Sequence, residues 1–253
     1  EDFNSDIHSI EVEQSGPVRA VVKIDGKHRA PSGREWLPFS VRLYFHAGSD
    51  GIRMTHTFVF DGDEHKDFIS SLGVRFSVPM RDECYNRHIR FAGQDQGLWA
   101  ESVQGLTGLR GDPGEEVRAA QIAGKKVPDI RSWNKDVSTR IHWVPTWGDF
   151  SLSQLNANGF SLKKRTKDGH GWINADQGHR TDGLAYVGGA SGGVAFGMRD
   201  FWKLHPTQLD IRDAATDSAQ VTIWMYSPEA PPMDIRFYHD GMGQDIEGPL
   251  ANV

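Results

Sequence analysis

The sequence has little cysteine, no long apolar run and no long basic run, and each absence excludes a class of protein. Cys84 is the only cysteine among 253 residues, which excludes an internal disulfide, a cysteine-based zinc site and a CxxC redox pair. No stretch approaches the roughly 18 apolar residues that a membrane-spanning helix needs. The formal charge of −6, without a long lysine or arginine run, argues against a nucleic-acid or anionic-membrane surface.

Familiar catalytic signatures are also missing. The chain contains no HExxH, no phosphate-binding GxxxxGK[ST] and no internal repeat, and no signal-peptide pattern opens it. Residues 189–193 (GASGG) formally fit the G-x-S-x-G nucleophile elbow. That motif requires a helix after the turn, whereas residues 194–198 alternate as a strand. We therefore expect a glycine-rich hairpin loop here.

Glycine, proline and aromatic residues are abundant. The sequence has 28 Gly and 12 Pro beside 8 Trp, 5 Tyr and 13 Phe, within an ordinary globular composition of 38% hydrophobic and 25% charged residues. Glycine and proline at this density separate many short strands, and exposed tryptophan suits ligands with flat apolar faces, sugars among them.

Alternation of apolar and polar residues predicts an all-β protein, an antiparallel β-sandwich with long loops and at most one or two short helices. Asp25-Gly26 is a hairpin-turn signal after the first alternating run. The strands that we expect cover residues 18–24, 41–45, 52–60, 72–78, 88–91, 97–103, 140–144, 159–164, 184–187, 194–199, 220–226 and 233–238.

One helix has a good start signal, with Asp112 as the expected N-cap, Pro113 at the first position and the helix continuing to Ile122. Alternation is lost between residues 105 and 135, which makes this interval a possible insertion. Otherwise we expect residues 1–253 to form a single domain.

Two polar features have ordinary structural explanations. His56 shares a strand face with Met54 and Phe58, which favours a hydrogen-bonded core histidine over a functional one. Residues 61–67 contain enough carboxylates for Ca²⁺ but lack the EF-hand spacing, which favours a plain turn. We expect no metal and no cofactor.

Two segments combine cations, imidazoles and tryptophan in glycine-rich or strand-end contexts. Residues 165–180 contain the candidates His170, Trp172, Asn174, His179 and Arg180. Residues 199–206 contain Arg199, Trp202 and Lys203. Tryptophan can cover the apolar face of a sugar, arginine can grip a carboxylate through two donors, and histidine titrates near neutrality. These residues suit a sugar acid, although polar loops that pack against a neighbouring domain remain an equal explanation.

Several dispersed motifs resemble the central domain of the exo-rhamnogalacturonan lyase and YetA-like family. The matching motifs are GREWLPF at 33–39, VRLYF at 41–45, HTFVFDGD at 56–63, DFI at 67–69, LGVRF at 72–76, GLAYVG at 183–188, RDFW at 199–202 and MDIRFY at 233–238.

The resemblance implies a central β-sandwich within a longer protein that also has an N-terminal barrel-like domain and a C-terminal α/α toroid. It implies a polysaccharide lyase that cleaves uronic-acid-containing glycan, rhamnogalacturonan-like, by β-elimination. The alternative is a non-catalytic sandwich that binds carbohydrate or braces the toroid. We expect a secreted or periplasmic protein that contacts an oligo- or polysaccharide, and no nucleic acid or membrane.

β-Elimination needs a cation at the uronate carboxylate, a base for the C5 proton and an acid for the leaving oxygen. Arg180 or Arg199 is the candidate cation, and His179 or His170 is the candidate base or acid. Trp172, Asn174, Trp202 and Lys203 are the candidate substrate-binding residues.

Overall fold

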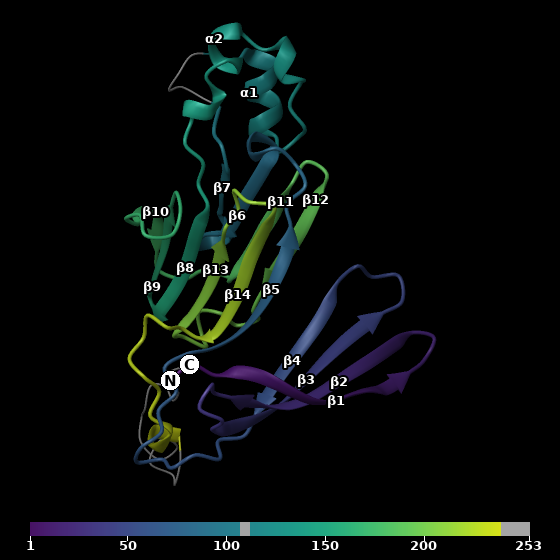
Figure 1. Cartoon of the computed structure of the whole chain (residues 1–253), viewed down its shortest axis with the longest axis vertical. Coiled ribbons are helices and arrows are strands. Elements are labelled where there is room, and N and C mark those ends of the chain that lie inside the picture. The colour runs from purple at the N-terminus through teal and green to yellow at the C-terminus, as the bar shows by residue number, and fades with distance from the viewer. Residues whose placement is uncertain (107–111, 239–253) are drawn as a thin grey trace. The chain divides into compact units, whose positions relative to one another are not determined.

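The computed structural model describes residues 1–106 and 112–238 (Figure 1). Within this part the chain forms fourteen strands and two α-helices, and every strand pairing is antiparallel. This confirms the predicted fold class. The chain divides into two compact units, the first with Glu1–Phe68 and the segment from Asp234, and the second with Ile69–Met233.

The first unit is a four-stranded sheet with the strand order β1-β2-β3-β4. The strands are β1 (Asn4–Ser15), β2 (Arg19–Arg29), β3 (Glu35–His46) and β4 (Ile52–Phe58). The hairpin predicted at Asp25-Gly26 is wrong, because β2 continues through these residues to Arg29. Its glycine instead lets Phe39 approach, since a Cβ on Gly26 would lie 2.6 Å from the Phe39 ring.

The second unit contains a six-stranded sheet, β10-β9-β8-β13-β14-β5, and a four-stranded sheet, β12-β11-β6-β7. The strands are β5 (Leu72–Pro79), β6 (Arg87–Ala92), β7 (Leu98–Ser102), β8 (Asp149–Asn156), β9 (Gly159–Arg165), β10 (Ile173–Gly178), β11 (Leu184–Gly189), β12 (Gly192–Gly197), β13 (Thr207–Arg212) and β14 (Ser218–Tyr226).

The two sheets of the second unit pack face to face over one apolar core. Phe150, Leu209 and Ile211 come from the six-stranded sheet, while Ile89 and Val187 come from the four-stranded sheet, and all five are fully buried. Alternation along each strand sends every second side chain into this core, as in other β-sandwiches. The intervening side chains therefore occupy the outer faces of the sandwich.

A helical segment interrupts the strands between β7 and β8. It contains α1 (Glu115–Ile122) and α2 (Lys135–Ser138), which have a small core of their own. The predicted N-cap is wrong by two residues: Gly114 is the N-cap, and Asp112 accepts a hydrogen bond from its backbone N–H (2.8 Å). Neither helix is long and apolar enough to cross a membrane.

Two predicted strands are wrong. Residues 140–144 contain the 3₁₀ helix Ile141–Trp143, and residues 233–238 contain the 3₁₀ helix Ile235–Tyr238, preceded by a single β-bridge between Ile69 and Met233. His56 also differs from expectation, because its Nδ1 is buried without a hydrogen-bond partner in the described part of the chain. It lies instead beside the Phe39 ring, 6.0 Å away between centroids.

Candidate functional site

The outer face of the six-stranded sheet carries polar side chains on four neighbouring strands. The registers place them in rows across the sheet. They are Asp149, Ser151 and Ser153 on β8, Lys163 and Arg165 on β9, Gln208, Asp210 and Arg212 on β13, and Thr222 and Trp224 on β14.

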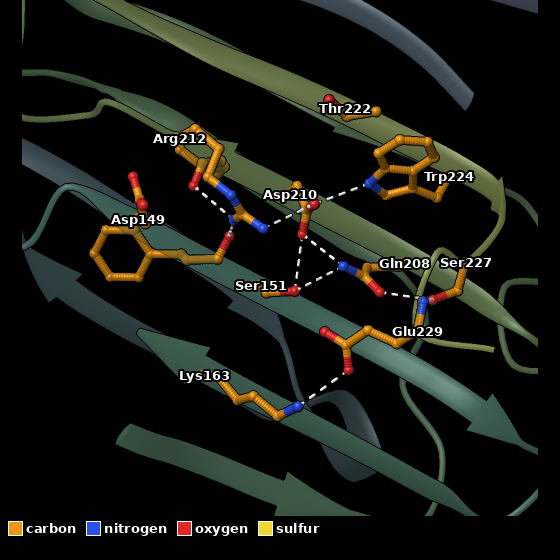
Figure 2. Close-up of polar contacts among 12 residues, drawn as sticks. Asp149, Ser151, Lys163, Gln208, Asp210, Arg212, Thr222, Trp224, Ser227 and Glu229 are labelled. Carbon is orange, nitrogen blue, oxygen red and sulfur yellow. Dashed lines mark hydrogen bonds and ion pairs between the residues drawn. The ribbon is translucent and has the colours of Figure 1, made fainter. Parts of the chain in front are cut away.

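Asp210 is the centre of a closed hydrogen-bond network on this face (Figure 2). Its Oδ1 accepts hydrogen bonds from Ser151 Oγ (2.8 Å) and Gln208 Nε2 (2.9 Å). Its Oδ2 accepts one from Trp224 Nε1 (2.9 Å) and lies 2.9 Å from a terminal nitrogen of Arg212. Asp210 is only 5% exposed. A buried carboxylate with four donors is a structural group, because no acceptor position is left for a ligand.

Trp172 lies beside two arginines at one edge of this network. The Arg165 guanidinium is 4.5 Å and the Arg212 guanidinium 4.9 Å from its ring centroid. Both arginines also bond inside the protein: Arg165 donates to Asp149 (2.7 Å) and Asp168 (2.7 Å), and Arg212 donates to the Phe150 carbonyl as well as contacting Asp210. This stack therefore holds the β9–β10 loop against the sheet.

The charge balance at Arg165 agrees with a structural role. Burial works against its charged form, but hydrogen bonds and charge attraction from Asp149 and Asp168 outweigh burial and raise its pKa. The guanidinium is therefore fixed in its charged state by carboxylates of the chain itself.

A second arginine–tryptophan stack lies at the other end of β10. The Arg180 guanidinium is 4.0 Å from the Trp202 ring centroid, and the Lys203 ammonium is 5.7 Å from it. Asp200 contacts Lys203 (3.2 Å) and Arg199 (3.6 Å). We call Arg180, Arg199, Asp200, Trp202 and Lys203 the loop-end cluster.

Arg180 differs from the arginines beside Trp172 in which of its guanidinium nitrogens form hydrogen bonds. Its Nε donates to the Ala157 carbonyl (3.1 Å) and to Asn158 Oδ1 (3.0 Å), which fixes the side chain against the β8–β9 turn. Neither terminal nitrogen has a hydrogen-bond partner within residues 1–106 and 112–238. We call these two free terminal nitrogens the Arg180 fork. Two parallel N–H donors that are held against an aromatic ring can bind both oxygens of a carboxylate ligand.

The predicted site residues thus fall into two groups. Arg180, Trp202, Lys203 and Arg199 share the loop-end cluster, and His179 is next to Arg180. Trp172, His170 and Asn174 lie toward the opposite end of β10, where His170 Nδ1 is 2.6 Å from Thr166 Oγ1. Six strand residues separate the groups by about 20 Å.

The backbone of His179 is fixed while its imidazole is exposed. Its N–H donates to Gln94 Oε1 (2.9 Å), and its carbonyl accepts from Gln154 Nε2 (2.8 Å). These bonds tie the loop after β10 to the β6–β7 connection, which contains Gln94, and to strand β8, which contains Gln154.

Sequence reasoning missed the polar network around Asp210. Its signal was available, because Gln208, Asp210 and Arg212 alternate with Leu209 and Ile211. Among the residues that the structure describes, no group of three or more His, Cys, Asp or Glu side chains is arranged to hold a metal ion.

Comparison with known proteins agrees with this architecture. Residues 1–247 match the family model described as the PcRGLX-like protein central beta sandwich domain. The chain is also 37% identical over 229 residues to a Bacillus subtilis (strain 168) protein described as uncharacterized protein YetA. That match covers 90% of this chain but 26% of YetA, so the chain spans about a quarter of that relative's length. The chain belongs to the family of PcRGLX-like central beta sandwich domains.

Proposed function

We propose that this chain is the central domain of a rhamnogalacturonan lyase-like protein and that its loop-end cluster binds a uronic-acid-containing glycan. The family name supports a domain of a larger, rhamnogalacturonan-acting protein. The observation that carries the binding proposal is the Arg180 fork, which lies on Trp202 with both terminal nitrogens free among the described residues.

The chemistry of the cluster fits an acidic sugar better than a neutral one. The two terminal nitrogens of Arg180 can donate in parallel to the two oxygens of a uronate carboxylate. Lys203 and Arg199 add positive charge, which Asp200 offsets only in part. The exposed parts of Trp202 offer apolar surface for the adjacent sugar ring.

The proposed reaction of the whole protein is β-elimination. A cation that neutralises the uronate carboxylate lowers the cost of removing the C5 proton, and Arg180 is the candidate for that role. His179 is the candidate for the proton transfer, because it is adjacent to Arg180 in the chain. The backbone hydrogen bonds of His179 fix the start of its side chain next to Arg180.

The test uses the full-length protein with rhamnogalacturonan and follows the ultraviolet absorbance of the unsaturated uronate product. We expect Arg180→Gln to raise KM by about tenfold or more, since it removes a charged hydrogen-bonding group. Arg140→Gln is the matched control, because Arg140 is also exposed and lies 5.9 Å from the Trp143 ring in the helical segment. An unchanged KM for Arg180→Gln would contradict the binding proposal, and hydrolysis without absorbance would contradict β-elimination.

A separate variant tests the role of His179. His179→Ala should lower kcat by about 10²- to 10⁴-fold if the imidazole transfers the proton. Thermal stability should change little, because only the backbone of His179 forms hydrogen bonds within the described part of the chain. Full turnover in this variant would place the proton transfer on another residue.

A further inference from the structure

The four-stranded sheet of the first unit has one face made of apolar side chains. The registers align Val12, Val22, Leu43 and Met54 in one row across all four strands. The apolar side chains that the registers place on this face, which also carries His56, are Ile10, Val12, Ala20, Val22, Ile24, Phe39, Val41, Leu43, Phe45, Ile52, Met54 and Phe58.

This apolar face is open to solvent over much of its area. Ile10 and Val12 are each 65% exposed, Ile52 is 58% exposed and Phe45 is 37% exposed. Ile10, Val12 and Ile52 lie on the two edge strands and Phe45 lies on β3, while Val22 and Leu43 at the centre are half-buried. The exposure is therefore found on both sides of the face. Contiguous apolar surface of this kind marks an interaction site on a soluble protein.

The reverse face of the same sheet carries several ion pairs at its surface, beside the buried Val21 (2% exposed). Lys23 is 2.8 Å from Asp25 and 3.6 Å from Glu11, and Arg42 donates to both carboxylate oxygens of Glu13 (2.8 and 2.9 Å). Ion pairs on one face and aliphatic side chains on the other are the pattern of a sheet with one covered side. A sheet of this kind becomes stable by packing its apolar side on a second layer.

We infer that the apolar face of β1–β4 is the docking surface for an adjacent domain of the same longer polypeptide. The matching family is described as a central domain, and this chain covers 26% of YetA, which leaves about three quarters of that relative in other regions. A neighbour on the same polypeptide is present at a high effective concentration, which favours it over a second copy. The neighbouring domain would present a complementary apolar layer to β1–β4.

The test compares thiol reactivity in this chain and in the full-length protein. Ile52→Cys places a thiol on the apolar face, and Thr57→Cys places one on the reverse face of the same strand as the matched control. The parent protein gives the background, because burial raises the pKa of the Cys84 thiol and slows its reaction. We expect Ile52→Cys to react about tenfold or more slowly in the full-length protein than in this chain, with Thr57→Cys unchanged.

Each other outcome contradicts the inference in a distinct way. Equal reactivity of Ile52→Cys in the two proteins would show that no further domain covers the face. Protection that appears only with a dimeric mass by light scattering would assign the face to a second copy. If Ile52→Cys fails to fold, Val12→Cys provides the same comparison, since Val12 is 65% exposed on β1.

Discussion

Arginine beside tryptophan occurs at both ends of β10, and the hydrogen bonds of each guanidinium decide what it can do. Arg165 donates through Nε and one terminal nitrogen to Asp149 and Asp168, and the two terminal nitrogens of Arg212 contact the Phe150 carbonyl and Asp210. Arg180 keeps both terminal nitrogens free among the described residues. The sequence predicted Arg180 and Trp202 as candidates but could not separate them from Trp172. Which donors are satisfied depends on strand register, because Asp149 faces Arg165 only through the β8–β9 pairing.

Removal of the Asp210 carboxylate should strongly destabilise the fold. Asp210→Ala removes the shared acceptor of the buried Ser151 and Gln208 donors and of the half-buried Trp224 and Arg212. We expect a loss of about 3–5 kcal/mol in the free energy of unfolding, measured by denaturant titration. Asp168→Ala is the control: its side chain is 93% exposed, so its ion pair with Arg165 should contribute at most about 1 kcal/mol. Similar losses in the two variants would show that the network around Asp210 contributes no more to stability than an exposed ion pair does.

The buried imidazole of His88 should make the fold less stable in acid. Burial lowers its pKa, the positive charge of Arg90 lowers it further, and Asp82 opposes this to a smaller extent. The folded-state pKa thus lies below the unfolded value of about 6.5, so the unfolded chain binds more protons as pH falls below that value. Stability should therefore fall on acidification, and the fall should be smaller in His88→Gln.

The measurement is the free energy of unfolding of the parent and of His88→Gln at about pH 7.5 and 5.5. In the variant, the free energy of unfolding should still fall as the pH falls, because burial and then the nearby His28 charge lower the pKa of His56. If the free energy of unfolding changed with pH by the same amount in the parent and in His88→Gln, burial would not lower the pKa of His88.

At the scale of elements, the hairpin of β11 and β12 explains the motif that imitates a nucleophile elbow. The strands Leu184–Gly189 and Gly192–Gly197 pair directly, as the alternation predicted, so Ser191 is in a turn and not at the start of a helix. Its hydroxyl donates to Asp82 (2.6 Å). The hairpin loop expected here is confirmed.

The glycines of this hairpin are required by close backbone approach. A Cβ on Gly193 would lie 2.5 Å from the Gly188 Cα and 2.6 Å from the Tyr186 hydroxyl. Gly193→Ala should therefore lower the free energy of unfolding by about 1–3 kcal/mol through forced displacement of the neighbouring strand. Gly171→Ala is the matched control, because nothing lies within 4 Å of its added Cβ. Equal melting temperatures for the two variants would contradict this explanation.

The strands that sequence reasoning missed have physical reasons for being hard to recognise. β1 and β10 contain register shifts, between Ile7 and Ser9 and between Asn174 and Asp176 for example, and each shift breaks the period of two. β8 and β13 do alternate, but most of their residues are polar because they carry the network around Asp210, and this weakens the strand signal. The wrong strand at 233–238 shows the converse, since its alternation occurs in a 3₁₀ turn.

At the scale of the whole molecule, the chain combines a closed sandwich with a sheet that has one apolar side open. The second unit buries its apolar residues between two sheets, whereas the first unit presents Ile10, Val12 and Ile52 to solvent. Alternation of apolar and polar residues predicts a sheet with one apolar face in both units and does not tell whether that face is covered. What covers an apolar face depends on the rest of the polypeptide, and no local sequence pattern carries that information.

The most direct test of the central claim is a calorimetric titration of this chain with a galacturonate-containing oligosaccharide and with the same oligosaccharide after reduction of its carboxyl groups. We predict that the acidic form binds, that added salt weakens binding, and that carboxyl reduction or Arg180→Gln weakens it by about tenfold or more. Arg140→Gln should leave the affinity unchanged. Equal affinity for the acidic and the reduced oligosaccharide, or an Arg180→Gln variant that binds as the parent does, would contradict a carboxylate-binding role for the loop-end cluster.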